Sequence, residues 1–373
     1  MAIPNTTVVQ PANAPNAVTH GTSRAASPAG SPSTYGLAAA PDNGHINEDV
    51  MQQIWDISKI PLPLTDMIGS TTAKNAYKEW VRDKLQDPTL DEVYADGEDV
   101  TDVHNAVGDR VGNHCQINGK RIVVSSRARS VDTIGRSDEL SYQVTRRQQE
   151  LRRNVEATML SGQGSRADDG SITNANSGKS AGLAAWIVTN RVANGATGGG
   201  YGTTSPTIVD ALTPSGAPAA LTEKDVRDVA QMIYEEGGDA SVFMSVPAVC
   251  RLFSEYLFSS SARIATLMAD QGKSTSPATA LGTVDVFVHD FGVLKIHPNR
   301  LQLLENSNQA SVFILDPSYI SQAILRGYRV EPLAKTGLAD KRLMSVDWTL
   351  VVNTELAQGL IAGVDPSAAV TAE

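Results

Sequence analysis

The sequence predicts a mixed α+β fold, and three observations point to that class. Residues 138–161 and 222–238 each place apolar side chains at helical spacing. Short apolar segments such as Ser311–Leu315 and Thr349–Val352 have the length and composition of strands. Helices and strands alternate without the regular strand–helix–strand period of a doubly wound sheet, and the chain has no internal repeat.

The first 46 residues form a segment with few charges and many turn-forming residues. Only Arg24 and Asp42 are charged, and six prolines between residues 4 and 41 exclude a continuous helix or a central strand. Such a segment cannot bury enough apolar surface to fold alone. Composition favours a disordered tail over an arm that becomes ordered along neighbouring subunits, and both interpretations stay open.

Ordered structure is expected to begin near Glu48 with a short helix. Asn47 can cap this helix, which extends through Ile57. The residue before a proline disfavours helical backbone, so the helix should end before Pro61 and Pro63.

Residues 83–109, called the acidic excursion below, break the pattern of alternating elements. They hold nine acidic residues and a single base, Lys84. They show no helical or strand period, which predicts a long exposed loop. A compact domain rarely keeps so long a structureless loop without a use for it, so we expect the excursion to have a function.

A β-hairpin is predicted next. Its strands are Val111–Ile117 and Lys120–Ser126, and its turn is Asn118-Gly119. Asn-Gly suits a two-residue turn because both positions need positive φ.

The clearest element is a helix over Asp138–Ser161, which contains neither proline nor glycine. Ser137 is the expected N-cap, and Gly162 is the expected stop. At ~1.5 Å per residue the helix is about 35 Å long. Its apolar side chains form one narrow stripe: Leu140, Val144, Leu151, Val155 and Met159. The charged residues, Glu156 among them, are expected on the remaining surface, much of which must meet solvent or another chain.

The rest of the chain is predicted as polar connections, a second helix and several strands. Residues 162–220 are polar and small except for the apolar segment Ala181–Val192. The second helix begins after Thr222, a good N-cap, and ends at Gly237-Gly238. The predicted strands are Ser241–Val246, Val284–His289, Val293–His297, Ser311–Leu315 and Leu343–Val352.

Composition excludes several classes of protein. The formal charge of −10 argues against extensive phosphate contacts with nucleic acid. Cys115 and Cys250 lie outside any CxxC spacing, so neither a disulfide framework nor a structural zinc site is expected. No apolar run approaches the ~20 residues of a membrane helix, and no secretory signal is apparent. We therefore expect the chain to stay in the cytoplasm of the cell that makes it.

One stretch partly matches two catalytic motifs. Ser180 lies in Gly178–Gly182, which matches the G-x-S-x-G pattern of a hydrolase nucleophile. The strand that must precede such a serine is missing, because Asp168–Ser177 is polar. A phosphate-binding loop ending at Gly178-Lys179-Ser180 lacks its first glycine, since Thr173 occupies that position. A hydrolase using Ser180 remains the alternative function.

A metal site is the other chemical alternative. His289, Asp290 and His297 lie close together in sequence, and paired strands could bring them together. No third ligand at helical spacing accompanies them, which favours ordinary strand and turn residues. The glycines from Gly195 to Gly202 do not fit a dinucleotide-binding pattern and are interpreted as a flexible surface loop. We predict no enzyme activity, no cofactor and no metal.

The order of these features resembles the Hong Kong 97 fold of tailed-bacteriophage major capsid proteins, and within it a podovirus and siphovirus group. The resemblance covers residues 48–362. It is carried by these motifs: Thr65-Asp66-Met67-Ile68-Gly69, Glu79-Trp80, Arg110-Val111-Gly112-Asn113, Val124-Ser125, Glu150-Leu151-Arg152-Arg153-Asn154-Val155-Glu156, Thr189-Asn190, Asp290-Phe291-Gly292, Pro298-Asn299-Arg300 and Leu333-Ala334-Lys335-Thr336-Gly337.

The resemblance implies an architecture and a function without chemistry. Residues 1–75 would be an N-terminal arm and 76–130 an extended loop. Residues 131–179 and 326–354 would form a peripheral domain with a spine helix at 138–161, and residues 180–325 and 355–373 an axial domain. The chain would self-assemble into hexamers and pentamers of an icosahedral shell that encloses double-stranded DNA. Another phage structural protein is a further alternative.

The charges suggest how subunits would meet. Residues 120–153 carry nine bases against four acids, so we expect the acidic excursion of one subunit to dock over this basic region of the next. Two solvated charged faces without mutual contact are the alternative. The expected interface residues are Asp91, Glu92, Asp96, Glu98, Asp99, Arg127, Arg129, Arg146, Arg147, Arg152 and Arg153.

The resemblance also implies partners and a location. We expect a separate scaffolding protein, a portal at one vertex and a possible decoration protein. Contact with packaged DNA should be weak and independent of sequence. The protein would belong to the virion capsid, assembled in the cytoplasm of a host bacterium.

Overall fold

The structure is a computed structural model, and we describe residues 61–85, 108–131, 135–170, 177–202, 207–259, 286–306 and 308–371, with residues 58, 88, 90, 93–97 and 99. The tail at 1–46 and the helix expected at 47–57 lie outside these residues.

The described helices are α1 Pro63–Met67, α2 Ser126–Ser130, α3 Glu139–Met159, α4 Leu183–Trp186, α5 Glu223–Glu235 and α6 Pro247–Ser259, with a 3₁₀ turn η1 at Pro317–Tyr319. The described strands are β1 Gly69–Thr72, β2 Tyr77–Arg82, β3 Asp109–His114, β4 Gln116–Ser125, β5 Ser165–Arg166, β6 Arg191–Val192, β7 Ala196–Gly198, β8 Thr207–Val209, β9 Leu212–Pro214, β10 Val242–Ser245, β11 Val286–His289, β12 Gly292–Pro298, β13 Ala310–Leu315, β14 Ile320–Leu333, β15 Ala339–Val352 and β16 Gly359–Val364.

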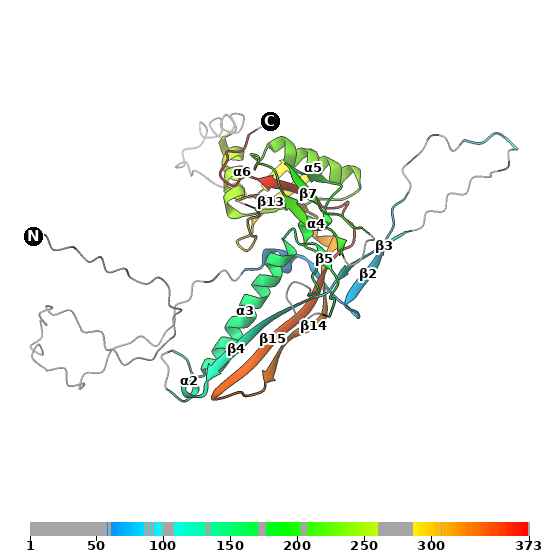
Figure 1. Ribbon diagram of the computed structural model, residues 1–373. Coiled ribbons are helices and arrows are strands. Elements are labelled where there is room, and N and C mark those ends of the chain that lie inside the picture. The colour runs from blue at the N-terminus through cyan, green and yellow to red at the C-terminus, as the bar shows by residue number, and fades with distance from the viewer. Residues whose placement is uncertain are drawn as a thin grey trace, which may run out of the picture. The chain divides into compact units, whose positions relative to one another are not determined.

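A four-stranded sheet in the order β1-β14-β15-β4 carries the long helix α3 on one face (Figure 1). β14 and β15 form a long antiparallel hairpin, and β4 pairs antiparallel with β15. Ile122 and Val124 of β4 pack on Leu140 of α3, and Met344 and Val346 of β15 join the cluster that contains Leu151. The apolar stripe predicted for this helix is therefore its contact with the sheet.

A second sheet has six strands in the order β11-β12-β10-β13-β16-β6, and it shares a hydrophobic core with α5 and α6. Thr222 caps α5, and Asp225 completes a reciprocal capping box. Phe243 of β10 and Phe253 of α6 stack with ring centroids 4.9 Å apart in its core. Four of the five strands predicted from sequence lie in this sheet as β10, β11, β12 and β13, and the fifth is β15 of the four-stranded sheet, with boundaries shifted by a few residues.

The predicted hairpin around Asn118-Gly119 is wrong. β3 pairs with β2, whereas Asn118 and Gly119 lie inside β4, opposite Val346 and Ser345 of β15. The side chain of Asn118 accepts a hydrogen bond from the indole N–H of Trp348, 3.2 Å away. Pairing with the long β15 satisfies the backbone hydrogen bonds of Asn118 and Gly119 in an extended conformation, so this dipeptide does not form a turn.

Two smaller predictions also need correction. The N-cap of α3 is Asp138, not Ser137, because the Asp138 carboxylate accepts hydrogen bonds from the amides of Leu140 and Ser141. The glycine-rich segment after Asn194 contains β7, which pairs with β9. Gly198 and Gly200 have positive φ, and the Gly200 amide donates to the carbonyl of Ala185. These glycines permit a close backbone approach.

Candidate subunit-contact surfaces

The acidic excursion leaves the body through the β2–β3 ladder, and ion pairs fix its base. Arg82 lies 3.7 Å from Asp109 and 3.8 Å from Glu355, measured between charged atoms. Lys84, the one base of the excursion, contacts Glu236 at 2.7 Å. Its attachment is therefore set by contacts with the rest of the subunit.

Aromatic side chains hold the same ladder against the core. The rings of Trp80 on β2 and Trp186 on α4 have centroids 5.5 Å apart. Trp186 also stacks on Tyr201 at 5.8 Å. The buried α4, predicted only as an apolar segment, thus supports the base of the excursion.

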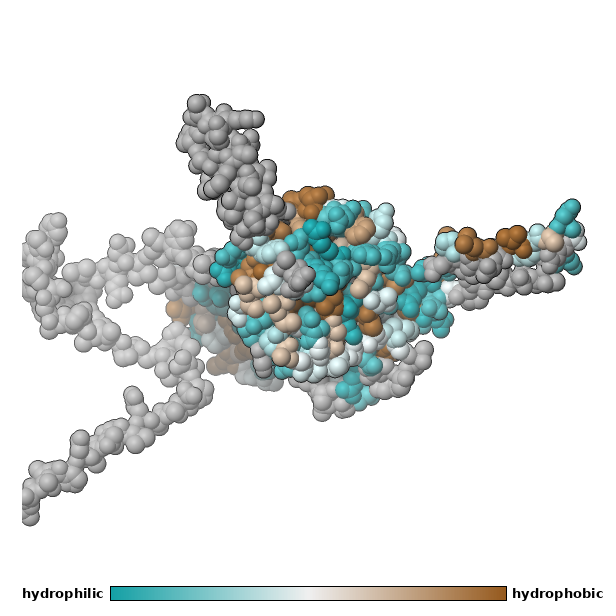
Figure 2. Space-filling view, turned by 90° about the horizontal axis from the view of Figure 1, so that it is seen from above, coloured by the Kyte–Doolittle hydropathy of each residue, from teal (hydrophilic) through white to brown (hydrophobic). Residues whose placement is uncertain are grey.

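The described part of the excursion exposes large apolar side chains together with acids. Leu85, Leu90 and Val93 are 92%, 93% and 81% exposed. Figure 2 shows brown, apolar side chains on the segment that extends beyond the main body. Asp96 and Asp99 are exposed as predicted, whereas Asp91, Glu92 and Glu98 lie outside the described residues. The charge pattern of the sequence predicts the acidic part of this surface but not its apolar part.

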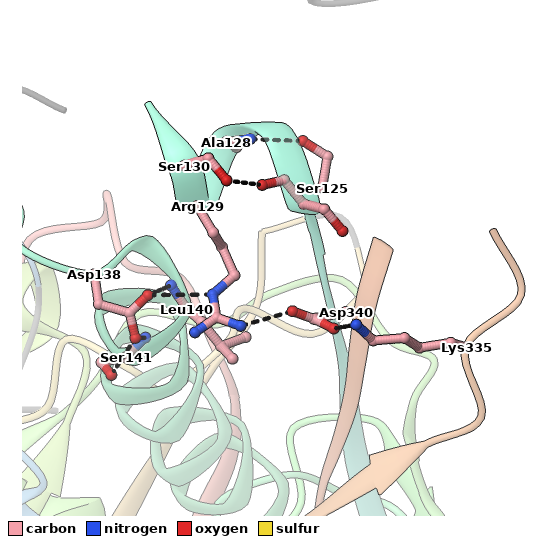
Figure 3. Close-up of polar contacts among 10 residues, drawn as sticks. Ser125, Ala128, Arg129, Ser130, Asp138, Leu140, Ser141, Lys335 and Asp340 are labelled. Carbon is pink, nitrogen blue, oxygen red and sulfur yellow. Dashed lines mark hydrogen bonds and ion pairs between the residues drawn. The ribbon is translucent and has the colours of Figure 1, made fainter. Parts of the chain in front are cut away.

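Arg129 belongs to a network at the junction of α2, α3 and β15 (Figure 3). Its guanidinium contacts Asp340 at 2.7 Å and Asp138 at 3.5 Å, and Lys335 contacts Asp340 at 2.6 Å. Hydrogen bonds from Lys335 and Arg129 lower the pKa of Asp340. Hydrogen bonds from Ser141, and then from backbone amides, lower the pKa of Asp138. The charge of Arg129 is therefore compensated within the subunit.

Arg146 and Arg147 both lie near the carboxylate of Glu150, which is one helical turn further along α3 than they are. Glu150 lies 2.6 Å from Arg147, 2.8 Å from Lys120 and 3.9 Å from Arg146. Burial opposes ionisation of Glu150, yet hydrogen bonds from Lys120 and Arg147 lower its pKa overall. The predicted basic surface is thus partly neutralised by its own helix.

The other three predicted arginines have different surroundings. Arg127 on α2 is exposed and has no carboxylate partner among the described residues. The Arg152 guanidinium lies 5.4 Å from the ring centroid of Tyr328. The Nε atom of Arg153 is buried without a hydrogen-bond partner in the described structure. Arg127 and Arg152, which are exposed, can offer more charge to another chain than Arg129 and Arg147 can.

Glu156 was expected on the polar surface of α3 and is instead completely buried. Its carboxylate accepts hydrogen bonds from the amides of Leu64 and Thr65 at 2.8 and 2.9 Å, and from the Asn299 side chain at 2.9 Å. The Thr65 hydroxyl also donates to it. Glu156 therefore joins α1 and the turn after β12 to the last turn of the long helix. Its position three residues before Met159 was the available signal, because residues at this spacing share a helix face and Met159 belongs to the apolar stripe.

Ser180 does not have the surroundings of a nucleophile. It is completely buried, and its hydroxyl oxygen accepts hydrogen bonds from the Asn113 side chain at 3.2 Å and the Leu350 amide at 3.1 Å. Its other neighbour is the Thr349 hydroxyl at 3.2 Å. Ser180 connects β3 to β15, and the geometry gives no support to a hydrolase.

The alternative of a metal site at His289, Asp290 and His297 is not supported by the geometry either. His289 pairs with Gly292 in the β11–β12 hairpin, and its Nδ1 accepts a hydrogen bond from the Phe291 amide at 3.3 Å. Burial lowers the pKa of His289. Within the described ranges, no three His, Cys, Asp or Glu side chains are grouped to hold a metal. The same residues include no helix long and apolar enough to cross a membrane.

Comparisons with known proteins agree with this arrangement. A family model described as "SU10 major capsid protein" matches residues 27–365. No curated protein matches the sequence. The solved structures that resemble the chain include the capsid of a native GTA particle, with 12% identity, 89% of this chain and 100% of that chain covered, and a TM-score of 0.55.

Two further structures share the fold. One is the SrpI encapsulin of Synechococcus elongatus PCC 7942, with 12% identity, coverage of 86% and 94%, and a TM-score of 0.51. The other is from Gordonia phage Cozz, with 12% identity, coverage of 91% and 97%, and a TM-score of 0.51. The GTA capsid, the encapsulin and the Gordonia phage structure therefore share this arrangement of elements with the chain.

Proposed function

The chain belongs to the SU10 major capsid protein family, and from that premise we propose that its copies join when the acidic excursion of one docks on the basic region of the next. It has the Hong Kong 97 fold, and its function is to form a capsid shell by assembling with copies of itself. The family role is structural, and no chemical step is required for it.

The finer arrangement is part of the proposal. Copies form hexamers and pentamers of an icosahedral shell around double-stranded DNA, in virions assembled in a bacterial cytoplasm. A scaffolding protein, a portal and a possible decoration protein complete the particle. The axial domain at 180–325 and 355–373 contains the six-stranded sheet, and the peripheral domain contains α3 and most of the β14–β15 hairpin.

The observation that carries the docking proposal is the exposure of the excursion. Large apolar side chains of the excursion are 81–93% exposed. A partner that covers them stabilises the complex by about 25 cal/mol for each Å² of apolar surface buried. The acids beside them select a basic partner. Each exposed ion pair contributes only about 0–1 kcal/mol, so the charges mainly determine where the excursion lies on its partner. Their small contributions add up over the copies in a ring.

The test neutralises acids of the excursion and asks whether shells form. Asp96→Asn with Asp99→Asn should reduce the yield of closed shells severalfold in negative-stain electron microscopy, with and without a candidate scaffolding protein. The matched control is Asp168→Asn with Asp210→Asn, which removes two exposed acids elsewhere. Shells of normal yield from the excursion variant would overturn the docking proposal, and the capsid role would remain.

A further inference from the structure

A cavity of about 210 Å³ lies between α1, α3 and β14. Apolar parts of its lining come from Leu62, which precedes α1, from Val155 of α3 and from Tyr328 of β14. Val155 is 1% exposed, and Tyr328 packs against the same hydrophobic core. The cavity is smaller than those that hold drug-sized ligands, so it has room for one small molecule.

Gln322 of β14 brings to this cavity a hydrogen-bond donor that no described residue accepts. The residue is 6% exposed, and its side-chain Nε2 is buried without a hydrogen-bond partner. The backbone of Gln322 pairs with Leu350 in the β14–β15 ladder, so the strand is held without the side chain. A buried donor without an acceptor destabilises a folded protein, and a bound molecule that supplies an acceptor removes this cost.

A cation lies at the same cavity. Arg152 of α3 is exposed and contacts no carboxylate among the described residues. Its guanidinium lies 5.4 Å from the ring centroid of Tyr328, a cation–π contact that holds the group near the cavity. The planar guanidinium matches the geometry of a carboxylate, to which it can donate two hydrogen bonds.

The remaining polar groups of the lining either have partners or face solvent. The Thr65 hydroxyl already donates to Glu156, so it needs no acceptor from a ligand. Asp66 is exposed, and its charge opposes an anion only weakly because water screens it. The buried donor of Gln322 and the guanidinium of Arg152 therefore decide what the cavity accepts.

We propose that this cavity binds a small carboxylic acid, in its ionised form, that carries a short branched apolar group. The carboxylate accepts hydrogen bonds from Gln322 and Arg152, and the apolar group contacts Val155 and Leu62. Such a ligand joins α1, α3 and β14, so it stabilises the folded subunit in proportion to its occupancy. The site lies within one subunit and does not depend on the docking proposed above.

The test measures ligand binding to the full-length, unassembled subunit. Isocaproate is the probe, and isocaproamide and isoamylamine are the matched neutral and cationic compounds. Saturation-transfer NMR detects weak binding, and thermal unfolding measures the stabilisation. Isocaproate should bind and raise the unfolding temperature. The amide should bind about tenfold more weakly or less, because it cannot form an ion pair with Arg152, and the amine should not bind.

Substitutions identify the groups that hold the acid. Gln322→Met and Arg152→Met should each weaken isocaproate binding about tenfold. Gln322→Met should not lower the unfolding temperature without ligand, because it removes a donor that has no acceptor. Asp66→Asn should tighten binding slightly, since it removes a negative charge. Arg251→Met, which removes an exposed arginine from α6, is the control and should bind like the wild type.

Three results would overturn the proposal. They are no binding of isocaproate to the wild type, equal binding by Gln322→Met and Arg152→Met, and tighter binding of the amine than of the acid. The last result would show that Asp66, and not Arg152, selects the ligand. Because every measurement uses the unassembled subunit, a failure of the docking proposal leaves these outcomes unchanged.

Discussion

Glu150 and Glu156 lie on the same helix, yet their surroundings are opposite. The Glu150 side chain is 23% exposed and contacts three cations. Glu156 is completely buried and meets no cation among the described residues, only hydrogen-bond donors. Ion pairs at the first site are screened by solvent, whereas donors at the second have no water to replace a lost acceptor. The burial of each carboxylate, more than its formal charge, therefore decides how much it contributes to the stability of the subunit.

The two sites also connect different parts of the subunit. Glu150 joins α3 to β4, two elements that already share an apolar contact between Leu140 and Ile122. Glu156 joins α3 to α1, a helix of five residues, and to Asn299. A helix so short has little stability of its own. Its position therefore depends on the carboxylate that receives its first amides.

The largest expected effect comes from Glu156→Ala. Four donors would lose their acceptor, and the two that are buried, on Leu64 and Asn299, cost about 1–3 kcal/mol each, so the subunit should lose at least about 2 kcal/mol of unfolding free energy. Urea unfolding of the unassembled subunit measures this loss. Glu156→Gln keeps one acceptor oxygen and should lose about half as much. Equal stability of the alanine variant and the wild type would show that water reaches the site.

The buried role of Glu156 illustrates what local patterns miss. Helices α3 and α5 were predictable because each has a cap and an apolar stripe within one continuous segment. The donors to Glu156 are 91, 92 and 143 residues away in the chain, so no local pattern contains them. The partner of Arg129, Asp340, is 211 residues away for the same reason.

The strands show the same limit. Ser311–Leu315 was predictable because β13 is buried along its entire length. β14 was missed because its first residues are buried, its later ones are largely exposed, and its register shifts near Arg326. No single period describes such a strand. The exposed acids of the excursion needed no tertiary information, whereas the pairing of β4 with β15 joins residues more than 200 positions apart.

A smaller effect is expected from Glu150→Ala. Its three cations are partly exposed and can be solvated, so the loss should be about 1 kcal/mol or less. The loss should shrink further in high salt, because screening weakens partly exposed pairs. Urea unfolding at low and high salt measures both values. A salt-independent loss as large as that of Glu156→Ala would remove the contrast between the two sites.

The smallest effect, and the one visible through pH, belongs to the Arg129 network. The pKa values of Asp138 and Asp340 are lowered in the folded subunit, so each contributes stability above its unfolded pKa, about 3.9, and loses it as pH falls through the folded value. Asp340→Asn should therefore unfold at slightly lower temperature than the wild type near neutral pH. The difference should vanish once the pH lies below the lowered pKa of Asp340 in the folded subunit, where both proteins lack the charge. Thermal unfolding across this range measures it, with Asp168→Asn as an exposed control. A difference that grows as pH falls would show that Asp340 acts through packing, because only the charged form can receive Arg129 and Lys335 as ion pairs.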